Sequence, residues 1–150
     1  ETMLGRGERA YQYYQQINPA AKNEVIDEYE CEPYVYPQNI LGDEHPQFGL
    51  ARNAWLTGTA SWAYQAGLKH ILGVRPEYDG LRVDPCIPPD WTGFGVERRF
   101  RGALYHITVT NPQGVCKGVA AVRVDGVDIE GTLLPVFKAG GEHQVDVIMG

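Results

Sequence analysis

The strongest helical pattern in this chain is Asn53-Ala-Trp-Leu-Thr-Gly-Thr-Ala-Ser-Trp-Ala-Tyr-Gln-Ala-Gly-Leu-Lys-His-Ile-Leu72, which Gly73 closes. Apolar and small residues recur in it at steps of three and four, as they do along one face of an α-helix. These residues are Leu56, Ala60, Ala63, Gly67 and Ile71. Because most of them are small, we expect this face to pack closely in a protein core.

The position at which this helix begins decides its chemistry. A start at Asn53 would place Gly58 in the helix interior, at a cost of about 1 kcal/mol relative to alanine. A start with Thr57 as the N-cap is cheaper, because Gly58 then becomes the first helical residue. A start at Thr57 also places free N–H groups, the Thr57 hydroxyl and a residue without a side chain together at the positive end of the helix dipole. Sites that bind phosphate have this arrangement. The alternative is an ordinary capped helix. The Thr-Gly-Thr motif alone is a weak signal for phosphate binding, so this alternative is preferred on the motif alone.

The composition limits the class of protein. The 150 residues carry a net charge of −6, and the densest basic run is Glu97-Arg-Arg-Phe-Arg101. Such a chain is a poor partner for nucleic acid or for an anionic membrane. No apolar stretch approaches the length of about 20 residues that spans a bilayer. Cys31, Cys86 and Cys116 are odd in number and lack metal-ligand spacing, so we expect free thiols, a cytoplasmic location and no metal.

The first half of the chain has helical character. Residues 1–17 predict an amphipathic helix, whereas residues 18–32 are polar and acidic and are expected to be irregular or to form one short helical turn. A short helix is expected over residues 32–41, where Pro33 suits the first turn and Pro37 limits the length. These segments cannot bury their own apolar faces, so we expect them to belong to a larger helical body.

The periodicity changes near residue 74 from that of helices to that of strands. Apolar and polar residues alternate over 103–109, which is typical of a half-buried strand. Arg101-Gly102 and Asp125-Gly126 are expected to form hairpin turns, the second of type I′. Short strands with turns every eight to twelve residues predict an antiparallel β-sandwich over residues 74–150.

Two groups of residues before position 74 suggest carbohydrate chemistry. Flat aromatic faces with polar edges suit sugar rings, although several of these residues, Trp62 above all, are explained more simply by core packing. The aromatic group is Tyr29, Tyr34, Tyr36, Trp55, Trp62 and Tyr64. The second group offers candidates for a glycosidase carboxylate pair, although an acidic loop is the simpler explanation. It consists of Glu28, Glu30, Glu32, Asp43 and Glu44.

The remaining polar candidates are weaker. His45 lies in a loop and is a candidate for binding an anion, whereas the other histidines are expected to be surface or packing residues. Ser61 lacks the Gly-x-Ser-x-Gly frame of a hydrolase nucleophile. The residues alone therefore do not name a reaction.

A series of sequence blocks, taken together, resembles the C-terminal end of the cellobiose and chitobiose phosphorylases of glycoside hydrolase family 94. The blocks are Glu32-Pro-Tyr-Val-Tyr-Pro-Gln38, Asn53-Ala-Trp-Leu-Thr-Gly-Thr-Ala-Ser-Trp62, His70-Ile-Leu-Gly-Val-Arg-Pro76, Tyr78-Asp-Gly-Leu81, Asp84-Pro-Cys-Ile-Pro88 and Arg98-Arg-Phe-Arg-Gly102. The resemblance implies a multidomain α+β protein with an (α/α)6 barrel that holds the active site. Residues 1–73 would be the last helices of this barrel, and residues 74–150 the small C-terminal antiparallel β-sandwich.

The resemblance also implies a reaction. Family members cleave a β-linked disaccharide with inorganic phosphate and release an α-sugar 1-phosphate with inverted configuration. Phosphate is the nucleophile and a substrate, so no cofactor is expected, and one carboxylic acid protonates the leaving oxygen. In the family this acid lies upstream of the present segment, so the chain would hold no catalytic residue and would be inactive alone. The implied partners are the upstream barrel, the two substrates and a second subunit of a homodimer.

Part of the family's phosphate site does match this sequence. The resemblance implies that Thr57 contacts phosphate through its hydroxyl, Gly58 through its main chain, and Gln38 from the neighbouring block. It leaves the identity of the disaccharide open. Two other interpretations remain: a noncatalytic carbohydrate-binding β-module with a helical lead-in, and a hydrolase of related helical-barrel architecture.

Overall fold

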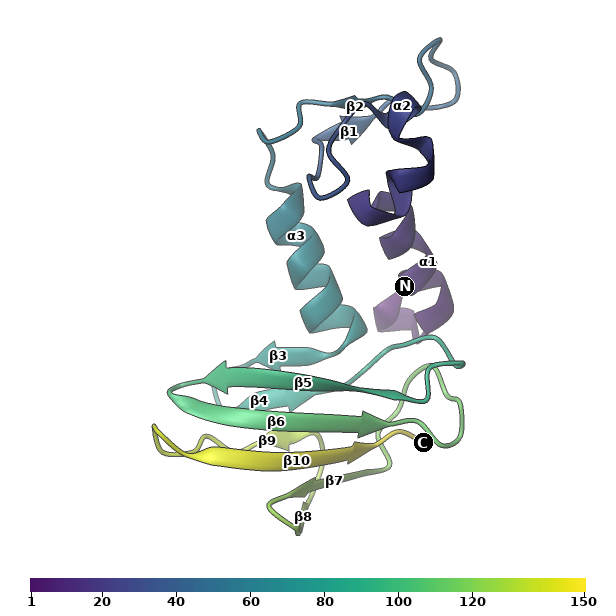
Figure 1. Ribbon diagram of the computed structural model, residues 1–150. Helices are drawn as coiled ribbons and strands as arrows, with labels where there is room; N and C mark the ends of the chain where they lie inside the picture. Colours follow the sequence, from purple (N-terminus) through teal and green to yellow (C-terminus); the bar gives the residue numbers. More distant parts are fainter. The chain divides into compact units, whose positions relative to one another are not determined.

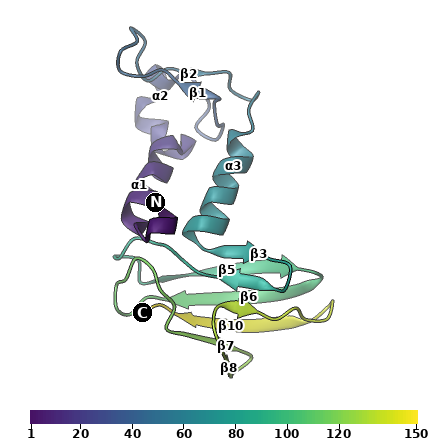
Figure 2. The ribbon, with the colours of Figure 1, turned by 180° about the vertical axis from the view of Figure 1, so that it is seen from behind.

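The computed structural model describes residues 1–150. The chain divides into two compact units, which we call the β unit (Glu1–Tyr11 and Leu68–Gly150) and the helical unit (Gln12–Gly67). Figure 1 shows the elements of both, and Figure 2 shows them from behind. None of the helices combines the length and the apolar character that a bilayer crossing requires.

The β unit contains two sheets. The larger has the strand order β5-β6-β10-β7-β8 and the smaller the order β3-β4-β9. The strands of the larger sheet are β5 (Gly93–Phe100), β6 (Ala103–Thr110), β10 (Glu142–Ile148), β7 (Ala121–Val124) and β8 (Val127–Ile129). Those of the smaller are β3 (Val74–Pro76), β4 (Leu81–Val83) and β9 (Leu133–Leu134). Figures 1 and 2 show the smaller sheet along one face of the larger, which agrees with the expected sandwich.

Both expected hairpin turns are confirmed. Arg101 and Gly102, between β5 and β6, have φ angles of 49° and 87°, and Asp125 and Gly126, between β7 and β8, have 49° and 81°. Positive φ at both central residues defines the type I′ turn, whose twist matches that of the flanking strands. The local sequence therefore determines these two hairpins.

The core of the β unit follows the predicted alternation. In β6 the side chains of Ala103, Tyr105, Ile107 and Val109 are buried, while the residues between them are more exposed. Their neighbours Val145 and Val147 in β10 are buried as well. The Tyr105 hydroxyl donates a hydrogen bond of 2.8 Å to the carbonyl oxygen of Pro135, which directly follows β9. The two sheets thus share one core.

One strand pair differs from the expected antiparallel arrangement. β10 runs parallel to β6, with a register from Glu142↔Leu104 to Ile148↔Thr110. A two-residue hairpin forces antiparallel pairing, whereas a long connection allows either direction. The chain forms β7, β8 and β9 between β6 and β10, so no tight turn fixes their relative direction. The larger sheet is therefore mixed.

The helical unit consists of short elements, and two short helices occupy most of the segment 18–32 that was expected to be mostly irregular. Its elements are η2 (Pro19–Val25), α2 (Ile26–Tyr29), β1 (Asn39–Ile40), β2 (Ala51–Arg52) and α3 (Thr59–Gln65). Helix α1 (Gly7–Ile17) is shorter than the expected 1–17, because a separate 3-10 turn, η1 (Thr2–Leu4), ends at Gly5 in the left-handed region. A small core of the helical unit gathers the buried side chains Tyr29, Cys31, Val35 and Ala51.

The prediction of a short helix over residues 32–41 is wrong. This segment forms a turn and then strand β1, which pairs antiparallel with β2. Pro37 has no N–H group to donate, and it disfavours helical geometry at the residue before it. A helix therefore does not continue through this segment. The main-chain N–H of Gln38 instead donates a hydrogen bond of 3.0 Å to the carbonyl oxygen of Arg52.

The helix expected to begin at Thr57 is present but differs in detail. α3 begins at Thr59, with Gly58 as its N-cap, and continues into the π-helical segment η3 (Ala66–Ile71). Ala63 and Ile71 are buried as predicted, whereas Ala60 is exposed and Leu56, which precedes the helix, is 82% exposed. Gly73 ends the element at φ 71°, where an added Cβ would collide with the main chain of Asp84. Only glycine fits this position without a backbone shift.

Candidate functional site

The predicted phosphate residues lie on two loops of the helical unit. Gln38 immediately precedes β1, and Asn53 immediately follows β2. The side-chain amide of Asn53 donates a hydrogen bond of 2.8 Å to Oε1 of Gln38. Thr57 lies four residues beyond Asn53, so its Cα is within about 14 Å of that of Asn53. The β1–β2 pair thus places Gln38 near the start of α3.

Thr57 makes the hydrogen bond expected of a helix cap. Its Oγ1 accepts the main-chain N–H of Thr59 at 3.0 Å and lies 2.6 Å from the hydroxyl of Thr59. A threonine oxygen in this role satisfies one of the unpaired N–H groups of the first helical turn. The hydroxyl hydrogen of Thr57 remains able to donate to a ligand when Thr59 supplies the hydrogen between the two hydroxyls.

Gly58 is exposed between these two threonines. A Cβ added to it would make an ordinary contact of 3.7 Å with the Trp62 ring, so packing does not require glycine here. The lack of a side chain instead leaves the main chain of Gly58 accessible from outside. A ligand can therefore approach this backbone closely.

The donors of this site are neutral. Because Oε1 of Gln38 accepts the bond from Asn53, the NH₂ group of Gln38 is the part of the side chain that remains for a ligand. The Thr57 hydroxyl and main-chain N–H groups complete the set. Neutral donors of this kind suit an anion at the positive end of peptide dipoles.

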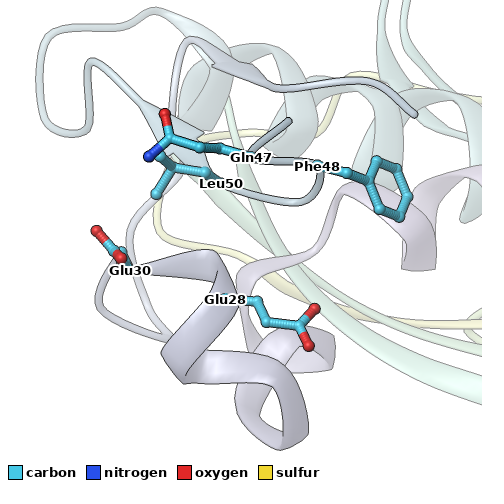
Figure 3. Close-up of a pocket in the computed structure, with 5 residues that line it drawn as sticks. All are labelled: Glu28, Glu30, Gln47, Phe48 and Leu50. Atoms are coloured by element: carbon cyan, nitrogen blue, oxygen red, sulfur yellow. The ribbon is translucent and has the colours of Figure 1, made fainter. Parts of the chain in front are cut away.

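Two of the acidic candidates, Glu28 and Glu30, do not face each other. Glu28 and Glu30 line a hollow of about 210 Å³ together with Gln47, Phe48 and Leu50. Figure 3 shows the Glu28 and Glu30 carboxylates directed to opposite sides of this hollow. A glycosidase pair requires two carboxylates that flank one bond, so the acidic-loop interpretation fits these two residues better.

The other loop candidates lie in a second hollow of about 360 Å³, lined by Leu41, Gly42, Asp43, Glu44 and His45. Nδ1 of His45 accepts the main-chain N–H of Gln47 at 3.0 Å. This bond stabilises the loop that contains His45. His45 therefore has a structural role that does not depend on an anion.

The six aromatic candidates separate into two groups. Tyr29 is buried, and Tyr36 is half-buried, with its pKa raised to about 12 by burial and by the neighbouring hydroxyls of Tyr14 and Tyr29. The exposed members are Tyr34, Trp55, Trp62 and Tyr64. The side chain of Trp62 is not part of a core within this chain, where it is 75% exposed. Four of the six candidates are thus exposed within this chain.

One polar contact in the β unit, between His143 and Asp125, was not predicted from the sequence. Nδ1 of His143 lies 2.7 Å from Oδ2 of Asp125, and its ring stacks on Phe137 with centroids 3.6 Å apart. The hydrogen bond with His143 lowers the pKa of Asp125, as does the bond that Oδ1 accepts from the N–H of Gln144. These contacts anchor the β7–β8 turn to β10. No local signal could have revealed a pair separated by eighteen residues.

Comparison with known proteins identifies both parts of the sequence. Residues 1–73 match the model of the glycosyl hydrolase 94 superfamily, catalytic domain. Residues 74–115 match that of the glycosyl hydrolase family 65, C-terminal domain. The first part of the chain is therefore similar to the catalytic domain of the glycosyl hydrolase 94 superfamily.

Three of the proteins that this chain resembles are phosphorylases. The chain is 48% identical to the N,N'-diacetylchitobiose phosphorylase of Vibrio proteolyticus and 49% identical to that of Vibrio furnissii, in each case over all 150 residues. It is 36% identical over 149 residues to the solabiose phosphorylase of Paenibacillus borealis. It covers 19%, 18% and 19% of the lengths of these relatives. The chain thus spans about a fifth of the curated relatives that it matches.

Proposed function

We propose that this chain is part of an inverting phosphorylase, which cleaves a β-linked disaccharide with inorganic phosphate to give an α-sugar 1-phosphate and a free sugar. The observation that carries the proposal is the identity of 48% and 49%, over the whole chain, to N,N'-diacetylchitobiose phosphorylases. A solabiose phosphorylase at 36% identity supports the reaction class beyond one particular sugar.

Residues 1–73 act in this proposal as the last helices of an (α/α)6 barrel, and residues 74–150 as the adjoining β-sandwich domain. The boundary between the two matched family models, at residues 73 and 74, supports this division. Apolar side chains on the helical unit, such as Tyr13, Ile17 and Tyr64, are 43–57% exposed. Burying them against further helices would be favourable, so they are suitable contacts for the rest of the barrel.

The chain supplies part of the phosphate site through Thr57, Gly58 and Gln38. Phosphate must approach the anomeric carbon while neutral donors hold its charge, and a position without a side chain provides room for that approach. The bond from Asn53 supports this role, because it directs the NH₂ group of Gln38 to the ligand. No cofactor is required, since phosphate is itself the nucleophile.

The general acid belongs to the upstream part of the enzyme, so the isolated chain is inactive. The enzyme acts as a homodimer in the cytoplasm. Free thiols at all three cysteines are compatible with a reducing compartment.

The test is the phosphate dependence of sugar cleavage. The intact protein is incubated with N,N'-diacetylchitobiose, with and without inorganic phosphate. We expect a sugar 1-phosphate when phosphate is present and no cleavage when it is absent. Release of free sugars without phosphate would identify a hydrolase. Turnover by the 150-residue chain alone would contradict the upstream position of the general acid.

The carbohydrate-binding module remains the second candidate. Among the aromatic residues of positions 74–150, Tyr78 alone is exposed, so that segment offers no paired aromatic surface for a sugar. Calorimetric titration of the chain with chito-oligosaccharides separates the two candidates. Binding without the rest of the protein would favour the module.

A further inference from the structure

We propose that Tyr34 and Trp55 form a stacking platform for a pyranose ring and that Glu32 accepts hydrogen bonds from the hydroxyls of that ring. The ligand is a neutral sugar with an apolar ring face. This inference rests on the proposed function, because it assigns to this surface the sugar that receives the phosphate.

The two rings form an ordered pair on the surface of the helical unit. Their centroids are 6.4 Å apart and their planes meet at 74°, an edge-to-face arrangement. Tyr34 is 73% exposed and Trp55 is 67% exposed. Within this chain, the pair therefore leaves aromatic faces uncovered.

The backbone and a hydrogen bond hold Trp55 in this position. Trp55 has a φ angle of 69°, a left-handed conformation that bulky residues seldom adopt. Its indole Nε1–H donates a hydrogen bond of 3.4 Å to Oε1 of Glu32. Such backbone strain at a bulky residue is typical of ligand-binding positions.

Glu32 retains acceptor capacity next to the rings. Besides the indole N–H, its carboxylate interacts with the Cys31 thiol, which donates to Oε2 at 3.7 Å. An ionised carboxylate has about four acceptor positions, so further ones remain for hydroxyl groups. Its negative charge disfavours phosphate, whereas the neutral donors of Gln38 and Thr57 favour it. The two substrates are thus expected to bind to different residues.

The platform lies beside the proposed phosphate residues. Trp55 is two residues from Thr57 and two from Asn53, so each Cα lies within about 7 Å of that of Trp55. Asn53 in turn holds Gln38. The platform and Thr57 therefore belong to one short segment of the chain, and the attack of phosphate on the anomeric carbon requires the two substrates to bind as neighbours.

The test uses steady-state kinetics of the intact protein with N,N'-diacetylchitobiose and phosphate varied in turn. Trp55→Ala, Tyr34→Ala and Glu32→Gln are compared with Tyr78→Ala, which removes an aromatic side chain that is 88% exposed in the β unit. We expect the first three to raise the KM for the disaccharide about tenfold, the equivalent of about 1.4 kcal/mol. The KM for phosphate should stay within about twofold, and Tyr78→Ala should change neither constant.

Two further measurements separate the possible failures. An unchanged KM for the disaccharide in all three variants overturns the platform, as does a lower Tm of Trp55→Ala without loss of sugar binding. Trp55→Phe, which keeps an aromatic face, should restore most of the affinity. If the wild-type protein shows no phosphorolysis, the proposed function fails. Calorimetric binding of the disaccharide, compared between wild type and Trp55→Ala, then still tests the platform.

Discussion

The side-chain amide of Asn53 donates a hydrogen bond of 2.8 Å to the side-chain carbonyl of Gln38, fifteen residues earlier in the chain. This bond connects the residue before β1 with the residue after β2. It fixes which end of the Gln38 amide is free, and the same segment leads within four residues to Thr57. The geometry of the proposed phosphate site therefore depends on a residue that does not itself contact phosphate.

Asn53→Ala should weaken phosphate binding without removing a phosphate contact. A neutral hydrogen bond contributes about 0.5–1.5 kcal/mol, so we expect the KM for phosphate to rise about two- to tenfold. The measurement is the steady-state kinetics of the intact protein. Asn23→Ala, at an exposed position of η2, is the matched control and should leave this constant unchanged. An equal KM for Asn53→Ala and wild type would show that Gln38 needs no such support.

Thr57→Ala should have the larger effect, because it removes a direct contact. A hydrogen bond to a charged group contributes about 1.5–3 kcal/mol, so kcat/KM for phosphate should fall roughly 10- to 100-fold. The variant also loses the bond to the N–H of Thr59, and a missing cap lowers the free energy of unfolding by about 1 kcal/mol.

Thr57→Ser separates the two effects of Thr57, since it keeps the hydroxyl. It should restore both the phosphate kinetics and the Tm. If Thr57→Ala lowers the Tm but leaves the phosphate kinetics intact, Thr57 is a cap and not a ligand.

The contact between Asp125 and His143 predicts a pH-dependent stability of the β unit. The folded state lowers the pKa of Asp125, chiefly through the bond with His143, from an ordinary value of 3.8. A carboxyl group with a lowered folded pKa stabilises the protein above its unfolded pKa, and this stabilisation is lost as the pH falls through the folded pKa. Asp125→Asn, which also tolerates positive φ in the turn, should therefore be less stable than wild type at pH 7.

Urea denaturation of wild type and Asp125→Asn across pH 2–7 measures this effect. The difference in free energy of unfolding should shrink as the pH falls below about 4. A difference that stays constant over the whole range would exclude the charge of Asp125 as its cause.

The buried face of the larger sheet can be tested with one substitution at two positions. Val147 in β10 is 1% exposed, whereas Val127 in β8 is 66% exposed. Val147→Ala should reduce the free energy of unfolding by about 2 kcal/mol, because it removes buried methyl groups and leaves a cavity. Val127→Ala should change it by less than about 0.5 kcal/mol. Similar losses at both positions would contradict the described register of β10.

The sequence predicted the parts of the fold that local rules decide. Positive φ at Asp125-Gly126 follows from the turn type that an Asp-Gly pair favours, and the alternation in β6 follows from one buried face. The parallel pairing of β10 with β6 depends on a long connection, for which no local signal exists. The error at residues 32–41 arose because Pro33 was expected to begin a helix, whereas Pro37 and the bond of Gln38 to Arg52 favour an extended chain.

The residues of the candidate site were predicted from the sequence by two different routes. Thr57 and Gly58 were visible as the start of a helix, whereas Gln38 entered through the family resemblance alone. Their proximity depends on the pairing of two strands of two residues each, which is too short for any periodicity to reveal. The display of Trp55 depends on a left-handed backbone angle that its sequence does not predict. These features arise from contacts between distant segments, so local sequence patterns do not predict them.

The most direct test of the central claim is an anomalous diffraction map from crystals of the intact protein soaked in arsenate, which mimics phosphate. We expect an arsenic peak whose oxygens lie within hydrogen-bonding distance of the Thr57 hydroxyl, the main chain of Gly58 and the side-chain amide of Gln38. Arsenate bound at another position, with these three residues free of it, would contradict the account.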